Sequence, residues 1–186
     1  MVTLAHQDDI YERTFLESTL RQLGPAKTPL IAFTDYYEIW DDRIATHRDF
    51  VNLRIKRTML LHLRNKKLRS GVWMRRLLLS FADPICCPSV TYVKENLPDR
   101  LFDEELSGSI DWAAWKRISG MSGSFVYIPH MLMGHRMYTG SSTLNLISSG
   151  KRKREDCEVL CRFWPAPLAK AINELYSHSQ KKRKKQ

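Results

Sequence analysis

The chain has 186 residues, 43% of them apolar, which is enough for one domain with a buried core. Its formal net charge is +10. It contains no apolar run of about 18 residues, which excludes a transmembrane helix from the sequence. The first apolar run stops after four residues, so no secretory signal peptide is expected. The four cysteines form no C-x-x-C pair, which argues against a zinc site and indicates a reduced, cytoplasmic protein.

The first predicted strand covers residues 2–5 and stops at a histidine and two adjacent carboxylates, His6, Asp8 and Asp9. We expect this strand to be buried, and the apolar spacing after it predicts a helix over residues 10–23. The carboxylates then lie at the carboxyl end of a strand, where ligands bind in open α/β sheets. Adjacent carboxylates suit Mg²⁺ or Mn²⁺. Capping of the helix is the other interpretation of the same pair.

The remaining elements alternate between strand and helix, so an α/β fold is expected. A strand over residues 30–40 lacks alternation and is predicted to be buried on both faces. The other predicted segments are a turn at 41–43, helices at 50–68 and 72–81, a strand at 89–93, a loop at 97–108, a helix at 112–118 with Asp111 as its N-cap, a strand at 124–128, a loop at 139–143, helices at 152–164 and 168–176, and a disordered tail at 177–186.

The basic residues are concentrated in two places. Residues 50–82 contain nine Lys/Arg and no Asp/Glu, and residues 181–185 add five more, leaving 16 basic against 20 acidic residues elsewhere. Basic amphipathic helices bind nucleic acid, calmodulin-like partners or an anionic membrane, or they simply present a solvated face. No aromatic platform, zinc finger or recognition helix accompanies this segment, so no specific nucleic-acid partner is expected.

Three segments carry a family resemblance by their order and spacing. Residues 4–11 read LAHQDDIY after the first strand, residues 110–115 read IDWAAW at the start of a helix, and residues 125–142 contain an aromatic strand, a proline and an arginine before small hydroxyl residues. Together they resemble the inverting family-two glycosyltransferases with the GT-A fold, over about residues 1–175. In that family the first segment holds a metal ion and the second supplies the catalytic aspartate.

The resemblance implies a partial GT-A (Rossmann-like) mixed sheet with flanking helices and a helical C-terminal end, formed by residues 1–176. It also implies Mg²⁺ or Mn²⁺ as cofactor, a nucleotide-sugar donor, and a saccharide or lipid-linked acceptor. The implied site residues are the metal ligands Asp8, Asp9 and His6, the general base Asp111, and the substrate- or phosphate-binding residues Trp112, His135 and Arg136. For Asp111 a simple capping role stays open, and for Trp112 a core role.

The chain departs from the family pattern at four points. His6 replaces the first aspartate of the metal motif, Ile110 replaces an acidic residue, and Tyr138 stands where a histidine often follows the arginine. The family also has two or more βα units before the metal-motif strand, whereas this chain begins at that strand. We therefore expect the C-terminal portion of a transferase, with an exposed apolar sheet edge and no activity alone.

Two other readings compete with the transferase. The sequence AHQDD at residues 5–9 resembles the Ala-His-Pro-Asp-Asp motif of LmbE-type zinc-dependent sugar deacetylases. A later His-x-x-His segment completes the zinc site in that family, but here His130 and His135 are separated by four residues. The third reading is a non-catalytic module that binds an anionic surface through residues 50–82. A basic face would also suit a transferase acting on a lipid-linked acceptor at the inner membrane surface.

Overall fold

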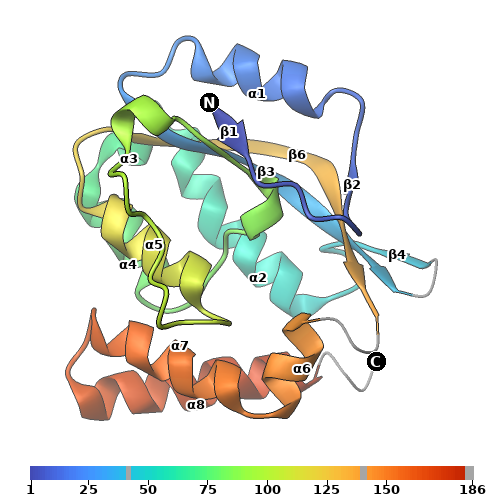
Figure 1. Ribbon diagram of the computed structural model, residues 1–186, viewed down its shortest axis with the longest axis vertical. Coiled ribbons are helices and arrows are strands. Elements are labelled where there is room, and N and C mark those ends of the chain that lie inside the picture. The colour runs from blue at the N-terminus through green and yellow to red at the C-terminus, as the bar shows by residue number, and fades with distance from the viewer. Residues whose placement is uncertain (41–42, 139–141, 183–186) are drawn as a thin grey trace.

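The computed structural model describes residues 1–40, 43–138 and 142–182, which form a mixed sheet with helices on both faces (Figure 1). The strand order is β1-β5-β3-β6-β2, and β4 pairs with β3. The strands are β1 (Val2–Thr3), β2 (Ile10–Tyr11), β3 (Pro29–Trp40), β4 (Arg43–Ala45), β5 (Val90–Tyr92) and β6 (Ser124–Met137). The expected α/β fold is therefore confirmed.

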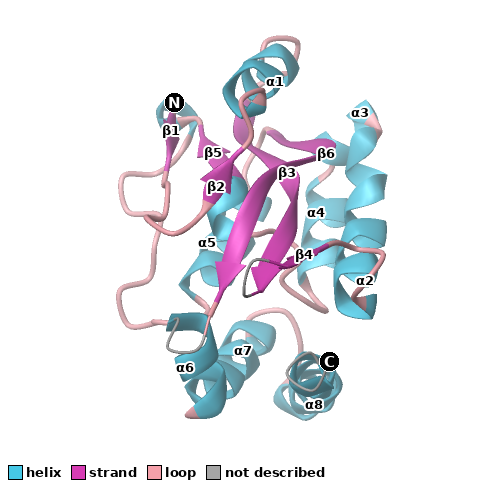
Figure 2. Cartoon of the chain, turned by 90° about the vertical axis from the view of Figure 1, so that its right-hand side faces the viewer, coloured by secondary structure: helices cyan, strands magenta, loops and turns pink. Residues whose placement is uncertain are grey.

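The long strands β3 and β6 run parallel at the centre of the sheet (Figure 2). All other strand pairs within the described residues are antiparallel. Side chains alternate between the two faces: Ile31 and Phe33 join the larger core cluster, whereas Ala32 joins the smaller one. Phe125 and Val126 divide in the same way on β6. The strand predicted at 30–40 is thus confirmed as buried on both faces.

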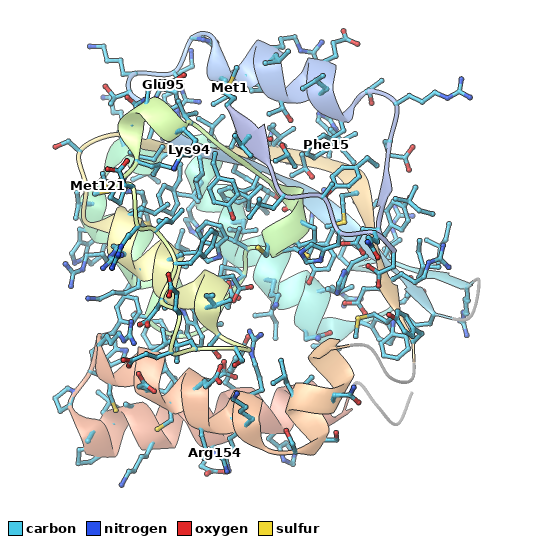
Figure 3. All side chains as sticks on the ribbon, viewed as in Figure 1. Met1, Phe15, Lys94, Glu95, Met121 and Arg154 are labelled. Carbon is cyan, nitrogen blue, oxygen red and sulfur yellow. The ribbon has the colours of Figure 1, made fainter. Side chains whose placement is uncertain are left out.

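The helices form two layers around this sheet and a group at one end of it. They are α1 (Phe15–Leu23), α2 (Val51–Leu60), α3 (Lys66–Ser70), α4 (Val72–Leu79), α5 (Ile110–Ser119), α6 (Ser142–Ser148), α7 (Lys151–Cys161) and α8 (Ala166–Lys182), with short 3₁₀ turns at η1 (Leu61–Arg64), η2 (Cys87–Ser89) and η3 (Lys94–Asn96). Helix α1 packs on one face through Phe15, which lies between helix and sheet (Figure 3). Helices α2 to α5 cover the other face, and α6 to α8 lie below it (Figures 1 and 2).

The N-terminal segment differs from its prediction. Strand β1 contains only two residues and pairs on one side, with β5, so Val2 is 46% exposed and the predicted burial is wrong. The helix begins at Phe15 instead of residue 10, because Ile10 and Tyr11 pair with β6 opposite Gly134 and Met133. Pairing with a distant strand thus overrides the helical spacing of the first apolar residues.

The C-terminal half also differs in length and extent. Strand β6 continues past the predicted end at residue 128 to Met137. Helix α8 runs to Lys182, so the predicted disorder is wrong for residues 177–182, while 183–186 lie outside the described residues. The predicted turn at 41–43 and loop at 139–143 fall partly outside them too, at 41–42 and 139–141. Among the described helices, none has both the length and the apolar composition to cross a membrane.

Candidate functional site

Asp9 is the centre of a cluster that joins the loop after β1 to the end of β6. Its side chain has no exposed surface. Oδ1 accepts hydrogen bonds from Nδ1 of His135 and from the backbone N–H of Arg136, both at 3.0 Å. Oδ2 accepts no hydrogen bond from the described residues, and Nδ1 of His6 lies 3.5 Å from it. One carboxylate therefore holds together two segments that are 126 residues apart.

The surroundings of Asp9 favour its ionised form. Burial alone would raise the pKa of this carboxyl group. The hydrogen bond and charge of His135, the backbone N–H of Arg136 and the charge of His6 outweigh burial, and the pKa lies below its usual value. Asp9 is therefore a carboxylate at neutral pH, with one oxygen still able to accept a ligand.

His6, Asp8 and Asp9 meet a geometric requirement for binding a cation. Each offers one ligand atom, and these atoms lie within 4.8 Å of one another. Opposite ligands of an octahedral Mg²⁺ ion are about 4.2 Å apart, so small side-chain rotations would bring the three into range. The buried, unpartnered Oδ2 of Asp9 adds an acceptor that needs a cation or donor. These residues therefore fit a divalent ion.

Arg136 supports the same loop from the other side. Its Nε donates to the backbone carbonyl of Asp8 at 3.2 Å. The guanidinium group is thus beside the carboxylate cluster, but it is not among the residues that line the cavity described next. Its predicted contact with phosphate stays a prediction.

A cavity of about 200 Å³ opens beside the cluster and is lined by residues from the end of β6 and from α2, α5, α7 and α8. His6 and His135, the two histidines in contact with Asp9, line it on one side, and Asp111 lines it as well. The other charged, thiol or phenolic side chains in the wall are Tyr36, Lys56, Asp83, Cys86, Cys87, Arg152 and Tyr176. The structure therefore places the predicted base Asp111, the predicted metal ligand His6 and the predicted phosphate-binding residue His135 at one cavity, whereas the other two predicted metal ligands, Asp8 and Asp9, are not among its lining residues.

Asp111 lies in the first turn of α5, not at its N-cap. The N-cap position belongs to Ser109, so the predicted capping role of Asp111 is wrong. Oδ1 of Asp111 accepts a hydrogen bond from the backbone N–H of Trp112 at 2.8 Å. A carboxylate in this position is stabilised by the positive end of the helix. Asp111 thus presents a carboxyl group to the cavity.

Helix α7 holds the loop that leads into α5. The carboxylate of Glu155 accepts hydrogen bonds from the backbone N–H groups of Ser107, Gly108 and Ser109, with the Gly108 bond at 2.6 Å. Burial would raise the pKa of Glu155, but these three N–H groups lower it below its usual value. Oγ of Ser109 donates to Asp156 at 2.7 Å. Because this loop directly precedes Asp111, α7 fixes the position of that residue.

Arg152 connects α7 to the cavity wall. Its Nε donates to Asp156 at 3.0 Å, its Nη1 donates to the carbonyl of Gly108, and its Nη2 lies 3.6 Å from Asp83. Arg154 on the same helix points away from the body of the protein (Figure 3). Sequence reasoning placed none of the α7 residues or Asp83 in the site. The sequence signal that could have indicated them is the pair of adjacent acids, Glu155 and Asp156, within the otherwise basic first half of α7.

Trp112 belongs to the core and not to the cavity. Its side chain has no exposed surface, and its indole N–H donates to the carbonyl of Leu79 at 2.9 Å. The ring packs edge-on against Tyr176, with ring centroids 5.5 Å apart. A side chain enclosed in this way cannot contact substrate, so the predicted substrate role of Trp112 is wrong and the core alternative holds.

The basic segment contributes less surface charge than its sequence suggests. Arg75 is fully buried and donates to two backbone carbonyls, at Gly123 and Met121. Arg69 is only 8% exposed, and Arg57 pairs with the buried Asp35 at 3.1 Å. These cations stabilise the fold. The exposed basic residues that remain are Arg54, Arg64, Lys66, Lys67 and Arg76.

The sequence was also compared with known families and proteins. No protein-family model and no curated protein matches the chain. The functional assignment therefore depends on Asp111, on the Asp9 cluster and on the cavity between them.

Proposed function

We propose that this protein is a glycosyltransferase that moves a sugar from a nucleotide-diphosphate donor to a saccharide or lipid-linked acceptor, and that its mixed sheet is of the GT-A type. The observation that carries the proposal is the shared cavity: Asp111 lines it together with His6 and His135, which both contact Asp9. A single displacement needs a base on one side of the reacting carbon and positive charge at the leaving group on the other.

Asp111 has the chemistry of the base. Its carboxylate takes the proton from an acceptor hydroxyl as that oxygen forms a bond to the anomeric carbon. The bond from this carbon to the diphosphate oxygen breaks, and the electron pair leaves with the diphosphate. His6, Asp8 and Asp9 would hold Mg²⁺ or Mn²⁺, which would supply positive charge to stabilise this leaving group. His135 orients Asp9, and Arg136 beside it is proposed to contact phosphate.

A zinc-dependent sugar deacetylase is the competing candidate. His6 and His135 both contact Asp9, and histidine with carboxylate is a common zinc ligand set. His135 contacts Asp9 through Nδ1, an arrangement that is compatible both with a residue that orients a metal ligand and with a histidine that binds zinc through Nε2. Elemental analysis separates the two candidates, because a deacetylase of this kind retains zinc through dialysis.

The Asp9 cluster is tested by manganese binding. We expect the protein to bind Mn²⁺, measured by electron paramagnetic resonance, and we expect Asp9→Asn to weaken the affinity by about tenfold or more. Asparagine keeps the oxygen that accepts from His135 and Arg136, so the loop stays in place while the second anionic oxygen is lost. Asp99→Asn, which removes an exposed carboxylate elsewhere, is the matched control. Equal affinity in both variants would refute a metal site at Asp9.

The exposed part of the basic segment supports a second proposal, contact with an anionic membrane. Trp73 is 70% exposed at the start of α4, close in sequence to Lys66, Lys67 and Arg76, which are also exposed. An exposed tryptophan among cations is typical of surfaces that rest in the headgroup layer.

Vesicle sedimentation tests this contact. We expect the protein to bind vesicles that contain anionic lipid. A variant in which Arg64, Lys66, Lys67 and Arg76 are all replaced by glutamine is expected to bind at least tenfold more weakly, because each cation contributes about 1 kcal/mol at such a surface. The control changes four exposed cations elsewhere: Arg13, Arg21, Lys94 and Arg100. Equal weakening in both variants would show a general charge effect, and salt-sensitive binding to nucleic acid alone would contradict the proposal.

A further inference from the structure

Asp83 is a buried carboxylate that accepts no hydrogen bond from the part of the chain that the structure describes. It follows α4, is only 3% exposed, and lines the cavity beside Asp111. Its Oδ1 accepts no hydrogen bond from the described residues, and its Oδ2 lies 3.6 Å from Nη2 of Arg152, beyond hydrogen-bond distance. A buried carboxylate in this condition is unfavourable unless a further donor reaches it.

The other buried carboxylates in the described residues are better satisfied. Asp35 accepts from the hydroxyl of Tyr127 at 2.6 Å, Asp156 accepts from Ser109, and Glu155 accepts from three backbone N–H groups. One oxygen each of Asp9, Asp35 and Asp156 also lacks a hydrogen bond within the described residues, so Asp83 differs from these acids in accepting none at either oxygen. Buried polar groups that lack a partner inside the protein are places where a ligand can supply one.

The charged groups around Asp83 come from three helices. Burial raises the pKa of Asp83 well above its usual value, and the nearby carboxylates of Asp111 and Asp156 raise it further. Lys56 from α2 and Arg152 from α7 oppose this rise. Arg152 is itself held by Asp156 and by the backbone carbonyl of Gly108, and its Nη2 lies 3.6 Å from Oδ2 of Asp83.

The size and lining of the cavity suit one sugar ring. About 200 Å³ is less than the roughly 300–1,000 Å³ of sites that enclose drug-sized molecules. Met59, Ile85 and Met137 give part of the wall an apolar character, while Asp83, Asp111 and Lys56 give the rest hydrogen-bonding groups. A sugar ring presents the same combination, with C–H faces for the apolar wall and hydroxyl groups for the charged one.

We propose that Asp83 is a specificity-determining residue that accepts a hydrogen bond from a ring hydroxyl of the acceptor saccharide seated in this cavity. Arg152 is the positioning residue that holds the Asp83 carboxyl group for that contact. That this saccharide is the acceptor depends on the transferase function proposed above. The binding of a saccharide ring to Asp83 itself needs neither metal nor nucleotide. The two proposals can therefore fail separately.

The test is saccharide binding by NMR without metal or nucleotide. The probes are the methyl glycosides of glucose, galactose, mannose and rhamnose, and we expect at least one to shift signals of residues that line the cavity. Asp83→Leu is expected to weaken that binding by about tenfold or more, because the hydrogen bond is lost, and Asp83→Asn, which keeps one neutral acceptor oxygen, is expected to weaken it by a smaller factor. Asp103→Asn is the matched control, since it breaks another Asp–Arg pair, with Arg162 at 2.9 Å, away from the cavity.

A stability measurement keeps the result interpretable. The pKa of Asp83 is raised in the folded state, so its effect on the free energy of unfolding is most favourable at acidic pH and is lost as the pH rises. Asparagine cannot ionise, so the Asp83→Asn variant does not lose this stability as the pH rises. We expect its melting temperature at pH 8 to be at least that of the wild type. No probe binding to the wild type, undiminished binding to Asp83→Asn, or a lower melting temperature of that variant at pH 8 would each overturn the proposal.

Discussion

Replacing Asp111 by asparagine is expected to slow sugar transfer by about 10²–10⁴-fold, the range that a positioned general base contributes. Asparagine matches the carboxylate in shape and still accepts the backbone N–H of Trp112, so α5 keeps its first turn. It cannot take a proton from the acceptor hydroxyl. Transfer is measured with a panel of nucleotide-sugars and Mn²⁺, both for this chain and for the longest reading frame that contains it.

The controls for Asp111→Asn separate chemistry from binding. Manganese affinity should stay at the wild-type value, because the Asp9 cluster is built from other segments of the chain. Metal-dependent binding of the nucleoside diphosphate should likewise persist. If nucleotide binding disappears together with transfer, Asp111 is a structural residue. If transfer continues at the wild-type rate, the base lies elsewhere.

Replacing Arg152 by methionine is expected to destabilise the fold by about 3–5 kcal/mol, the usual effect of removing one partner from a buried ion pair. Arg152 is 17% exposed and compensates the charges of both Asp83 and Asp156, which are almost fully buried. Methionine fills similar space but leaves those two carboxylates without their cation. Chemical unfolding measured at neutral pH gives the free-energy difference.

The pH dependence of this effect identifies its origin. The pKa values of Asp83 and Asp156 are raised by burial, and the loss of Arg152 would raise them further. Both acids are therefore protonated more readily in the variant, and the destabilisation should shrink as the pH falls towards 5. Arg154→Met, an exposed position two residues along the same helix, should change stability by less than about 0.5 kcal/mol. Similar effects of the two substitutions would contradict the ion-pair account.

The elements that sequence patterns predicted well are those buried on both sides. Strand β3 and the start of β6 read as β-prone runs because their neighbours cover both faces, and α5 reads as a helix because its buried residues recur at helical spacing. The N-terminus failed for the opposite reason. Ile10 and Tyr11 form a strand because they pair with residues of β6, and the spacing of neighbouring residues in the sequence carries no information about such a distant partner.

The site was predictable only where a local motif marked it. His6, Asp9 and Asp111 stand out beside a strand or helix start, and the structure brings the first and last of them to one cavity. Asp83 and Arg152 acquire their roles from contacts between α7 and the loop after α4, which no short pattern records. For Trp112 the local motif was misleading: it predicted a substrate contact, but a large aromatic side chain beside a catalytic candidate can equally be buried in the core, as Trp112 is.

The bond between Asp9 and His135 spans 126 residues, and Asp35 meets Tyr127 across 92. Contacts this remote in sequence form only after long segments have already been ordered, and folds built on them reach the native state slowly. The contact between Asp9 and His135 therefore requires β6 to have reached the N-terminal segment. If a cation binds at the site proposed here, its binding would report that this long-range contact has formed.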